Sequence, residues 1–185
     1  MEAEKYPPPQ ERFKKVILSL AELMRKELIK ARKKNVKVIS ENIVEFGITL
    51  VEESDERDLI KGFIKRSFPI EEKTGERISC WDSVFEKDRR FFFENSSVIF
   101  GELSSGIIDG IIVLLEENEN LLEGTWKHLF SLVKICINFI YLSKDPKVEK
   151  KKEGGFDIIY TNKKYEYINV EDLASKWGVN LLNAK

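Results

Sequence analysis

Residues suited to catalysis or metal binding are scarce in this chain. His128 is the single histidine, and the two cysteines, Cys80 and Cys136, are far apart and form no CxxC pair. A zinc site needs several Cys or His ligands at short spacings, and a Ser or Cys nucleophile would have only His128 to activate it. We therefore expect no metal site and no catalytic site, and His128 is expected at a helix surface. An enzyme is the least supported class.

Phosphate-binding loops are also missing from the sequence. Segment 101–110, GELSSGIIDG, matches neither GxxxxGK[ST] nor GxGxxG and has no lysine. Gly154 and Gly155 follow a lysine run without opening a helix, which is typical of a linker. Together with the shortage of nucleophiles, this predicts no cofactor and no small-molecule substrate.

One compact constellation stands out: Asp88, Arg89, Arg90 and Phe91, with Trp81 nearby in the sequence. The ordinary interpretation is a capped helix with an Asp–Arg pair beside core aromatic residues. The functional interpretation is a contact surface. Of three consecutive phenylalanines, two can enter a core, and the third lies at a helix end or is exposed.

A second candidate surface is the basic segment 10–37, which has ten Lys or Arg against three Glu, a net charge of +7. Segment 94–123 has seven acidic residues and no Lys or Arg. Opposite charges of this size predict surfaces that pair within one fold or between copies. The candidate contact residues of the basic segment are Arg25, Lys26, Lys30, Arg32, Lys33 and Lys34.

Helices are needed to position these residues. Pro7, Pro8 and Pro9 predict an extended arm, after which an amphipathic helix begins near Gln10. Its apolar seam consists of Phe13, Ile17, Leu20, Met24, Leu28 and Ala31. A second helix is predicted over 36–50, with a strand as the alternative for its β-branched first part.

Three further helices follow the same kind of pattern. Ser54 is expected to cap a helix that ends before Pro69. Residues 79–93 form the next predicted helix, and Ser104 or Ser105 begins another one.

The longest apolar run, 126–142, predicts a helix that is buried on most of its circumference. Asn118 and Asn120 are expected to end the preceding helix. The residues expected to be most buried are Leu132, Ile135 and Phe139. The run contains lysines and is shorter than about 20 residues, so a membrane span is not expected.

The C-terminal part predicts a small β-hairpin and a last helix. Residues 156–161 and 165–170 alternate as two strands. The helix is predicted over 170–177, capped by Asn169 and closed by Gly178.

These patterns together predict a mainly α protein: a single-domain helical bundle of five to seven helices with a small C-terminal β-hairpin. The expected division is an extended arm at 1–9, a helical core at 10–143, a charged linker at 144–155 and an appendage at 156–185. The low cysteine content and the absence of a signal pattern in MEAEKYPPPQ predict a soluble cytoplasmic protein.

Two stretches, RDLIKGFIKRSF and ISCWDSVFEKDRRFFFENSSVIFGEL, resemble a pattern found in uncharacterised helical proteins of large nucleocytoplasmic DNA viruses. There an apolar helix, a Trp-Asp pair, a charged-Asp-x-x-Phe-Phe element and an IFGEL segment follow one another, and a helix like SLVKICINFIYL comes later. The resemblance covers residues 57–142, and the loop 71–76 separates its first two parts. It implies a viral, non-enzymatic, largely helical protein that acts in the host cytoplasm or in the virion.

For function, the sequence favours a structural or protein-interaction protein that binds itself or another protein. We expect a homodimer that uses the seam and charge of the first helix. The competing view is that seam and charges are satisfied inside one chain, which leaves a monomer. The alternative function is association with nucleic acid, through the basic first helix or through segment 170–180, which resembles the first part of a helix-turn-helix. No membrane partner is expected.

Overall fold

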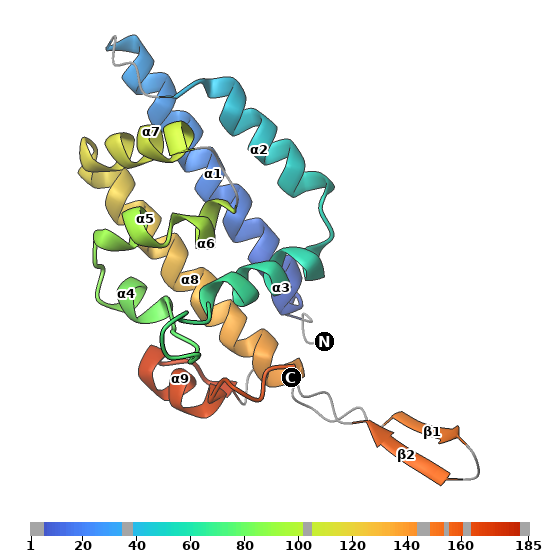
Figure 1. The fold of residues 1–185 in the computed structure, drawn as a ribbon. Coiled ribbons are helices and arrows are strands. Elements are labelled where there is room, and N and C mark those ends of the chain that lie inside the picture. Colours follow the sequence, from blue (N-terminus) through green and yellow to red (C-terminus); the bar gives the residue numbers. More distant parts are fainter. Residues whose placement is uncertain are drawn as a thin grey trace. The chain divides into compact units, whose positions relative to one another are not determined.

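The computed structural model describes residues 6–34, 39–101, 105–143, 149–153, 156–160 and 164–181. Within these residues the chain is mainly helical, as predicted (Figure 1). It divides into two compact units, Met1–Val133 and Lys134–Lys185, and the division lies inside one long helix, α8 (Glu119–Ser143). The other helices of the first unit are α1 (Pro9–Lys33), α2 (Glu41–Glu53), α3 (Glu56–Ser67), α4 (Trp81–Phe85), α5 (Arg90–Glu94), α6 (Ser96–Phe100) and α7 (Ser105–Glu116). The second unit adds β1 (Glu149–Glu153), β2 (Phe156–Tyr160) and α9 (Val170–Trp177).

Helix α1 begins at Pro9, in the first helical turn, where proline lacks only a donor that would be unpaired anyway. It packs against α2 and α3, and α3 packs against α6 (Figure 1). The predicted seam faces this interior: the ring of Phe13 meets that of Phe63 edge-to-face at 5.3 Å. The buried residues of the seam are Phe13, Leu20, Met24 and Leu28, whereas Ile17 and Ala31 are half-buried.

Helices α1 and α8 meet in an antiparallel contact. Three pairs form it, at increasing positions in α1 and decreasing positions in α8: Ser19 with His128, Leu23 with Gly124, and Glu27 with Asn118. At the middle pair, a Cβ atom added to Gly124 would lie 2.7 Å from Leu23 Cδ2. A glycine at this position therefore leaves room for the Leu23 side chain against α8.

Two predicted helix boundaries are wrong, because a polar residue serves a different helix from the one expected. Ser54 ends α2, and Asp55 caps α3 by accepting hydrogen bonds from the backbone N–H groups of Arg57 and Asp58. Asn118 does not end a helix; its Oδ1 accepts from Leu121 N at 2.9 Å and so caps the start of α8.

The single helix predicted over 79–93 is two short helices instead. After α4 the chain turns at Lys87, whose φ is 51°, a left-handed conformation that a lysine seldom adopts. Asp88 Oδ1 then accepts from Arg90 N at 3.0 Å, and α5 begins. With the further break at Asn95, before α6, this raises the number of helices among the described residues to nine, above the expected five to seven.

Residues 41–53, including β-branched Ile43 and Val44, are helical, so the strand alternative is wrong for that part. Ile39 lies in neither a helix nor a strand, and Val36 and Val38, on which the rest of that alternative depends, lie outside the described residues. Gly47 lies within α2 without ending it.

The long helix α8 is buried on most of its circumference, as predicted. Leu132, Ile135 and Phe139 are buried, at 1%, 7% and 8% exposure. They are not the deepest residues. Residues at 0% exposure recur at the spacing of one helix face, and Leu129, Val133, Cys136 and Ile140 are among them.

In the second unit, the C-terminal hairpin is not found as predicted. Strand β2 pairs in antiparallel register with β1, from Glu149 opposite Tyr160 to Glu153 opposite Phe156. Its partner thus lies in the segment predicted as a linker, and residues 164–169 contain no strand. The predicted Asn-Lys turn at 162–163 lies outside the described residues.

Helix α9 has the predicted bounds. Asn169 Oδ1 accepts from Asp172 N at 3.2 Å, and Gly178 ends the helix with a φ of 64°. Its apolar side chains Val170, Ala174 and Trp177 are buried. Among the described residues, no helix combines the length and the hydropathy that a membrane crossing requires.

Candidate functional site

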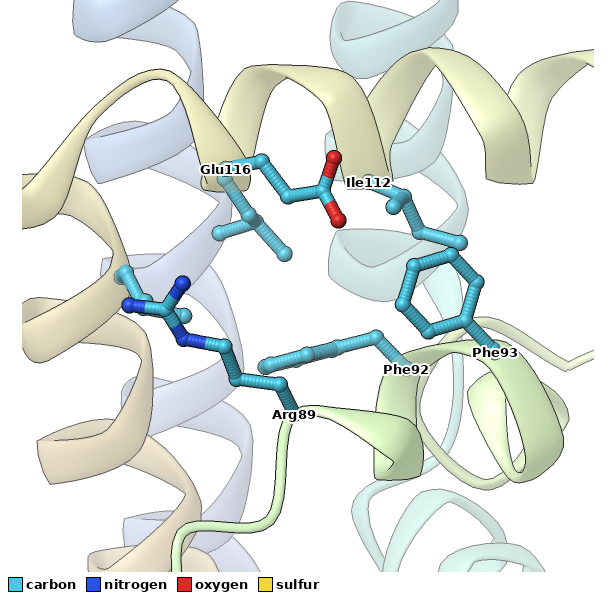
Figure 2. A pocket seen from close by; sticks show the side chains of 7 residues that line it. Arg89, Phe92, Phe93, Ile112 and Glu116 are labelled. Carbon is cyan, nitrogen blue, oxygen red and sulfur yellow. The ribbon is translucent and has the colours of Figure 1, made fainter.

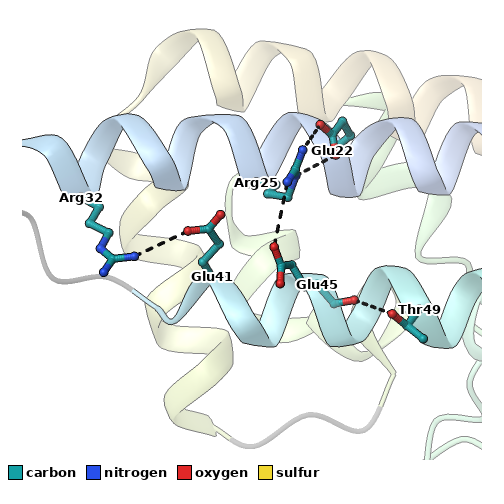
Figure 3. Close-up of polar contacts among 6 residues, drawn as sticks. All are labelled: Glu22, Arg25, Arg32, Glu41, Glu45 and Thr49. Carbon is teal, nitrogen blue, oxygen red and sulfur yellow. Dashed lines mark hydrogen bonds and ion pairs between the residues drawn. The ribbon is translucent and has the colours of Figure 1, made fainter.

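The basic face of α1 is largely paired with acidic side chains of the same unit (Figure 3). Arg25 donates two hydrogen bonds to the Glu22 carboxylate, at 2.9 and 2.7 Å, and lies 4.0 Å from Glu45 of α2. Arg32 lies 3.7 Å from Glu41. The hydrogen bond from Arg25 lowers the pKa of Glu22 and raises that of Arg25, so both groups are charged over a wide pH range.

Two other lysines of α1 have partners as well. Lys30 Nζ lies 2.7 Å from Glu27, and Lys14 Nζ donates to the backbone carbonyls of Glu52 and Ser54 at 2.7 and 2.9 Å. The second contact places a positive charge at the C-terminal end of α2, where helix carbonyls are unpaired. The remaining predicted contact residues of this face, Lys26, Lys33 and Lys34, are exposed.

The second predicted surface, residues 88–91, is only partly at the surface. Arg90 donates from Nε and Nη2 to the Asp88 carboxylate, at 3.0 and 2.7 Å to Oδ2, which lowers the pKa of Asp88. Phe91 is 1% exposed, and its ring lies 5.7 Å from Phe92 and 6.3 Å from Trp126. Phe91 therefore belongs to the core and cannot contact a partner.

Phe93 is the exposed member of the phenylalanine triplet, at 58%, which confirms that two of the three enter the core. It borders a small hollow together with Arg89 and Glu116, whose charged groups extend toward the same space (Figure 2). The other residues that line the hollow are Phe92, Ile112, Leu115 and Leu122. An apolar floor with opposite charges at its mouth suits contact with a single side chain more than it suits a chemical step.

The cysteine side chains are buried, and both nitrogens of the histidine ring have polar partners. Burial raises the pKa of the Cys80 thiol to about 11, and its Sγ donates to Asn95 Oδ1 at 3.3 Å. Burial also raises the pKa of Cys136. His128 Nδ1 donates to the Gly124 carbonyl of the same helix at 2.7 Å, and Nε2 lies 3.0 Å from Ser19 Oγ of α1, so both ring nitrogens have partners and Nε2 joins α8 to α1. In the described part of the chain no three His, Cys, Asp or Glu residues gather as metal ligands.

The surface that sequence analysis missed is on α2. None of its thirteen residues is buried, although apolar residues are frequent in it. Phe46 and Leu50, one helical turn apart, are 64% and 49% exposed. The sequence signal was present, since Phe46 and Leu50 are apolar residues one turn apart within the helix predicted over 36–50, but apolar residues at this spacing ordinarily belong to the core.

Comparison of the chain with protein-family models, curated proteins and solved structures finds no match. The resemblance to viral helical proteins accordingly stays a prediction. The function has to be argued from the surface itself.

Proposed function

We propose that this protein is a non-enzymatic interaction protein and that α2 is the surface with which it binds a partner protein. The observation that carries the proposal is the exposure of Phe46 and Leu50 on a helix without a single buried residue. Large apolar residues that are adjacent and exposed mark interaction sites more often than isolated ones do. Because they lie on consecutive turns of α2, they form one continuous ridge.

Self-association through α1, the interface expected from the sequence, is less supported than a different partner. The seam that would form it is buried inside the first unit, against residues such as Phe63. The cations of α1 that would complement a second copy, Arg25 and Lys30 among them, already contact glutamates of their own chain. The partner is therefore best sought among other proteins, in the host cell or the virion if the viral resemblance holds.

Association with nucleic acid is the alternative. Lys26, Lys33 and Lys34 are exposed and could contact phosphates, but Arg25, Lys30 and Arg32 face carboxylates. Binding to phosphates would weaken steeply as salt is raised, whereas a largely apolar protein interface would not.

The test is affinity purification from the native source with identification of the co-purifying molecules. The double variant Phe46→Ser, Leu50→Ser should lose the partner. A matched control is Ile70→Ser, Ile78→Ser, which removes two isoleucines of similar exposure, 57% and 47%, from another place on the first unit. Loss of the partner from the control variant, with the partner kept by the Phe46→Ser, Leu50→Ser variant, would contradict the proposal. Co-purification of nucleic acid that moderate salt releases would also contradict it.

A further inference from the structure

We propose that a hollow at the start of α8 binds a small zwitterion, namely an α-amino acid with an apolar side chain. This α8 hollow has a volume of about 460 Å³, within the range of small-molecule sites, and is lined by residues of the turn 87–89 and of the first two turns of α8. No sequence motif marks the site, because its residues come from two separate segments. None of its lining residues belongs to α2, so the inference is independent of the proposed function.

The turn that contributes the cations of the α8 hollow is held in an unfavourable conformation. Lys87 has a φ of 51°, and residues held in this left-handed region cluster at ligand-binding sites. Lys87 Nζ lies 2.9 Å from the Glu123 carboxylate, which joins the turn to α8. Asp88, the next residue, pairs with Arg90. These two pairs fix the turn and leave Arg89 for a ligand.

Two opposite charges line the α8 hollow without meeting each other. Arg89 and Glu119 are both exposed, and neither makes an ion pair with any residue that the structure describes. The Arg89 guanidinium is extended on the side away from Phe93 (Figure 2). A guanidinium binds a carboxylate through two parallel hydrogen bonds. The Glu119 carboxylate, with the amide oxygen of Asn120 beside it, can accept hydrogen bonds from an ammonium group.

The balance of charge argues against an ion of one sign. The charged residues that line the α8 hollow are two cations and two carboxylates. Lys87 and Glu123 neutralise each other, which leaves Arg89 and Glu119. A simple anion would meet the Glu119 carboxylate and a simple cation would meet Arg89, and like charges at a contact cost affinity. A molecule that has both an ammonium and a carboxylate group satisfies both residues at once.

The floor of the α8 hollow is apolar. Leu122 and Trp126 lie one turn apart on α8 and both line it. They are 7% and 3% exposed, so each presents a small apolar edge to the hollow while the rest of its side chain is packed in the core. These edges can cover a short apolar side chain of the ligand while its two charged groups stay at the surface.

The experiment uses the full chain with L-leucine as the probe and two analogues that each lack one charge. Isoamylamine is leucine without the carboxylate, and isocaproate is leucine without the ammonium group. Binding is measured by NMR titration at moderate salt, followed at the backbone amides of Glu119 and Asn120 and at the Trp126 indole. L-Leucine should bind with a millimolar dissociation constant and about three- to tenfold more tightly than either analogue.

Two variants assign the two charges. Arg89→Gln should weaken L-leucine by about three- to tenfold and remove its advantage over isoamylamine, and Glu119→Gln should remove its advantage over isocaproate. The matched controls are Lys127→Gln and Glu117→Gln, which neutralise exposed neighbours of the site that do not line the α8 hollow. Both controls should keep the affinity of the wild type.

Three results would overturn the inference: no leucine-dependent shift at these signals, equal binding of L-leucine and one of the analogues to the wild type, or an equal loss of affinity in a control variant. None of them bears on α2, which is tested separately by capture of the native partner.

Discussion

Among single residues, burial decides what the cysteines can do. A thiol reacts as the thiolate, and the Cys80 side chain is enclosed and hydrogen-bonded to Asn95, with its pKa raised to about 11. At neutral pH it is present almost wholly as the neutral thiol. The side chain with the greatest nucleophilic potential in the first unit is thus a packing residue.

The raised pKa of Cys80 predicts a loss of stability in alkaline solution. The unfolded chain releases this proton near the ordinary pKa of 9.0, whereas the folded protein keeps it until about 11. The folded state then holds more protons, so the free energy of unfolding falls as pH rises through this window. Urea unfolding at pH values of about 7.5 and 10 should show a fall about 1 kcal/mol greater in wild type than in Cys80→Ser. Equal falls would contradict the assignment.

At the scale of the helices, local side-chain bonds set where each element begins. Asp55 accepts from two backbone N–H groups of α3, while the Ser54 hydroxyl donates backward to the Leu50 carbonyl at the end of α2. Two adjacent polar residues therefore serve two different helices.

Replacing the cap of α3 should show this division. Asp55→Ala leaves two N–H groups unpaired and should lower the free energy of unfolding by about 1 kcal/mol. Ser54→Ala removes one exposed hydroxyl bond and should cost less than about 0.5 kcal/mol. Chemical denaturation of the two variants measures both. A larger loss at Ser54 would mean that the cap expected from the sequence was right after all.

Helix α2 should be stabilised by a change that its open face permits. Gly47→Ala adds a Cβ into empty space and improves helix propensity, so the free energy of unfolding should rise by about 0.5–1 kcal/mol. The control is Gly101→Ala: Gly101 has a φ of 68°, which alanine adopts only with strain, and stability should fall. Thermal melts of both variants provide the comparison. A drop in stability for Gly47→Ala would show that the space is occupied.

For the whole molecule, burial of the α1 seam and pairing of its charges bear on oligomeric state. A dimer through α1 would have to expose Phe13, Leu20 and Met24 from the interior first. That cost is of the order of 1.5–3 kcal/mol for each side chain.

Light scattering at micromolar concentration should accordingly give a mass near 21.6 kDa. The physical reason is that the apolar seam of α1 and cations such as Arg25 and Lys30 already make their contacts within one chain. A doubled mass would support the homodimer expected from the sequence. Reversal of Arg25, Lys26 and Lys30 to glutamate would then test whether α1 forms it.

Sequence alone determined the features that depend on neighbours along the chain. The limits of α9 follow from Asn169 and Gly178, and the seam of α1 follows from the three- and four-residue spacing of its apolar side chains. Both rest on bonds and contacts within one or two helical turns, which the local sequence specifies. The mainly helical fold was predictable for the same reason.

Tertiary structure decided which of these local surfaces are covered. Nothing near Phe91 and Phe93 in the sequence distinguishes them, yet the first packs on Trp126 and the second is exposed. Likewise Glu45 meets Arg25, and Phe46 meets no core, because of how α2 lies along α1. Such contacts join residues distant in sequence, and the free energy of burying one face depends on the partner that arrives. The candidate site on α2 is therefore a property of the packed chain.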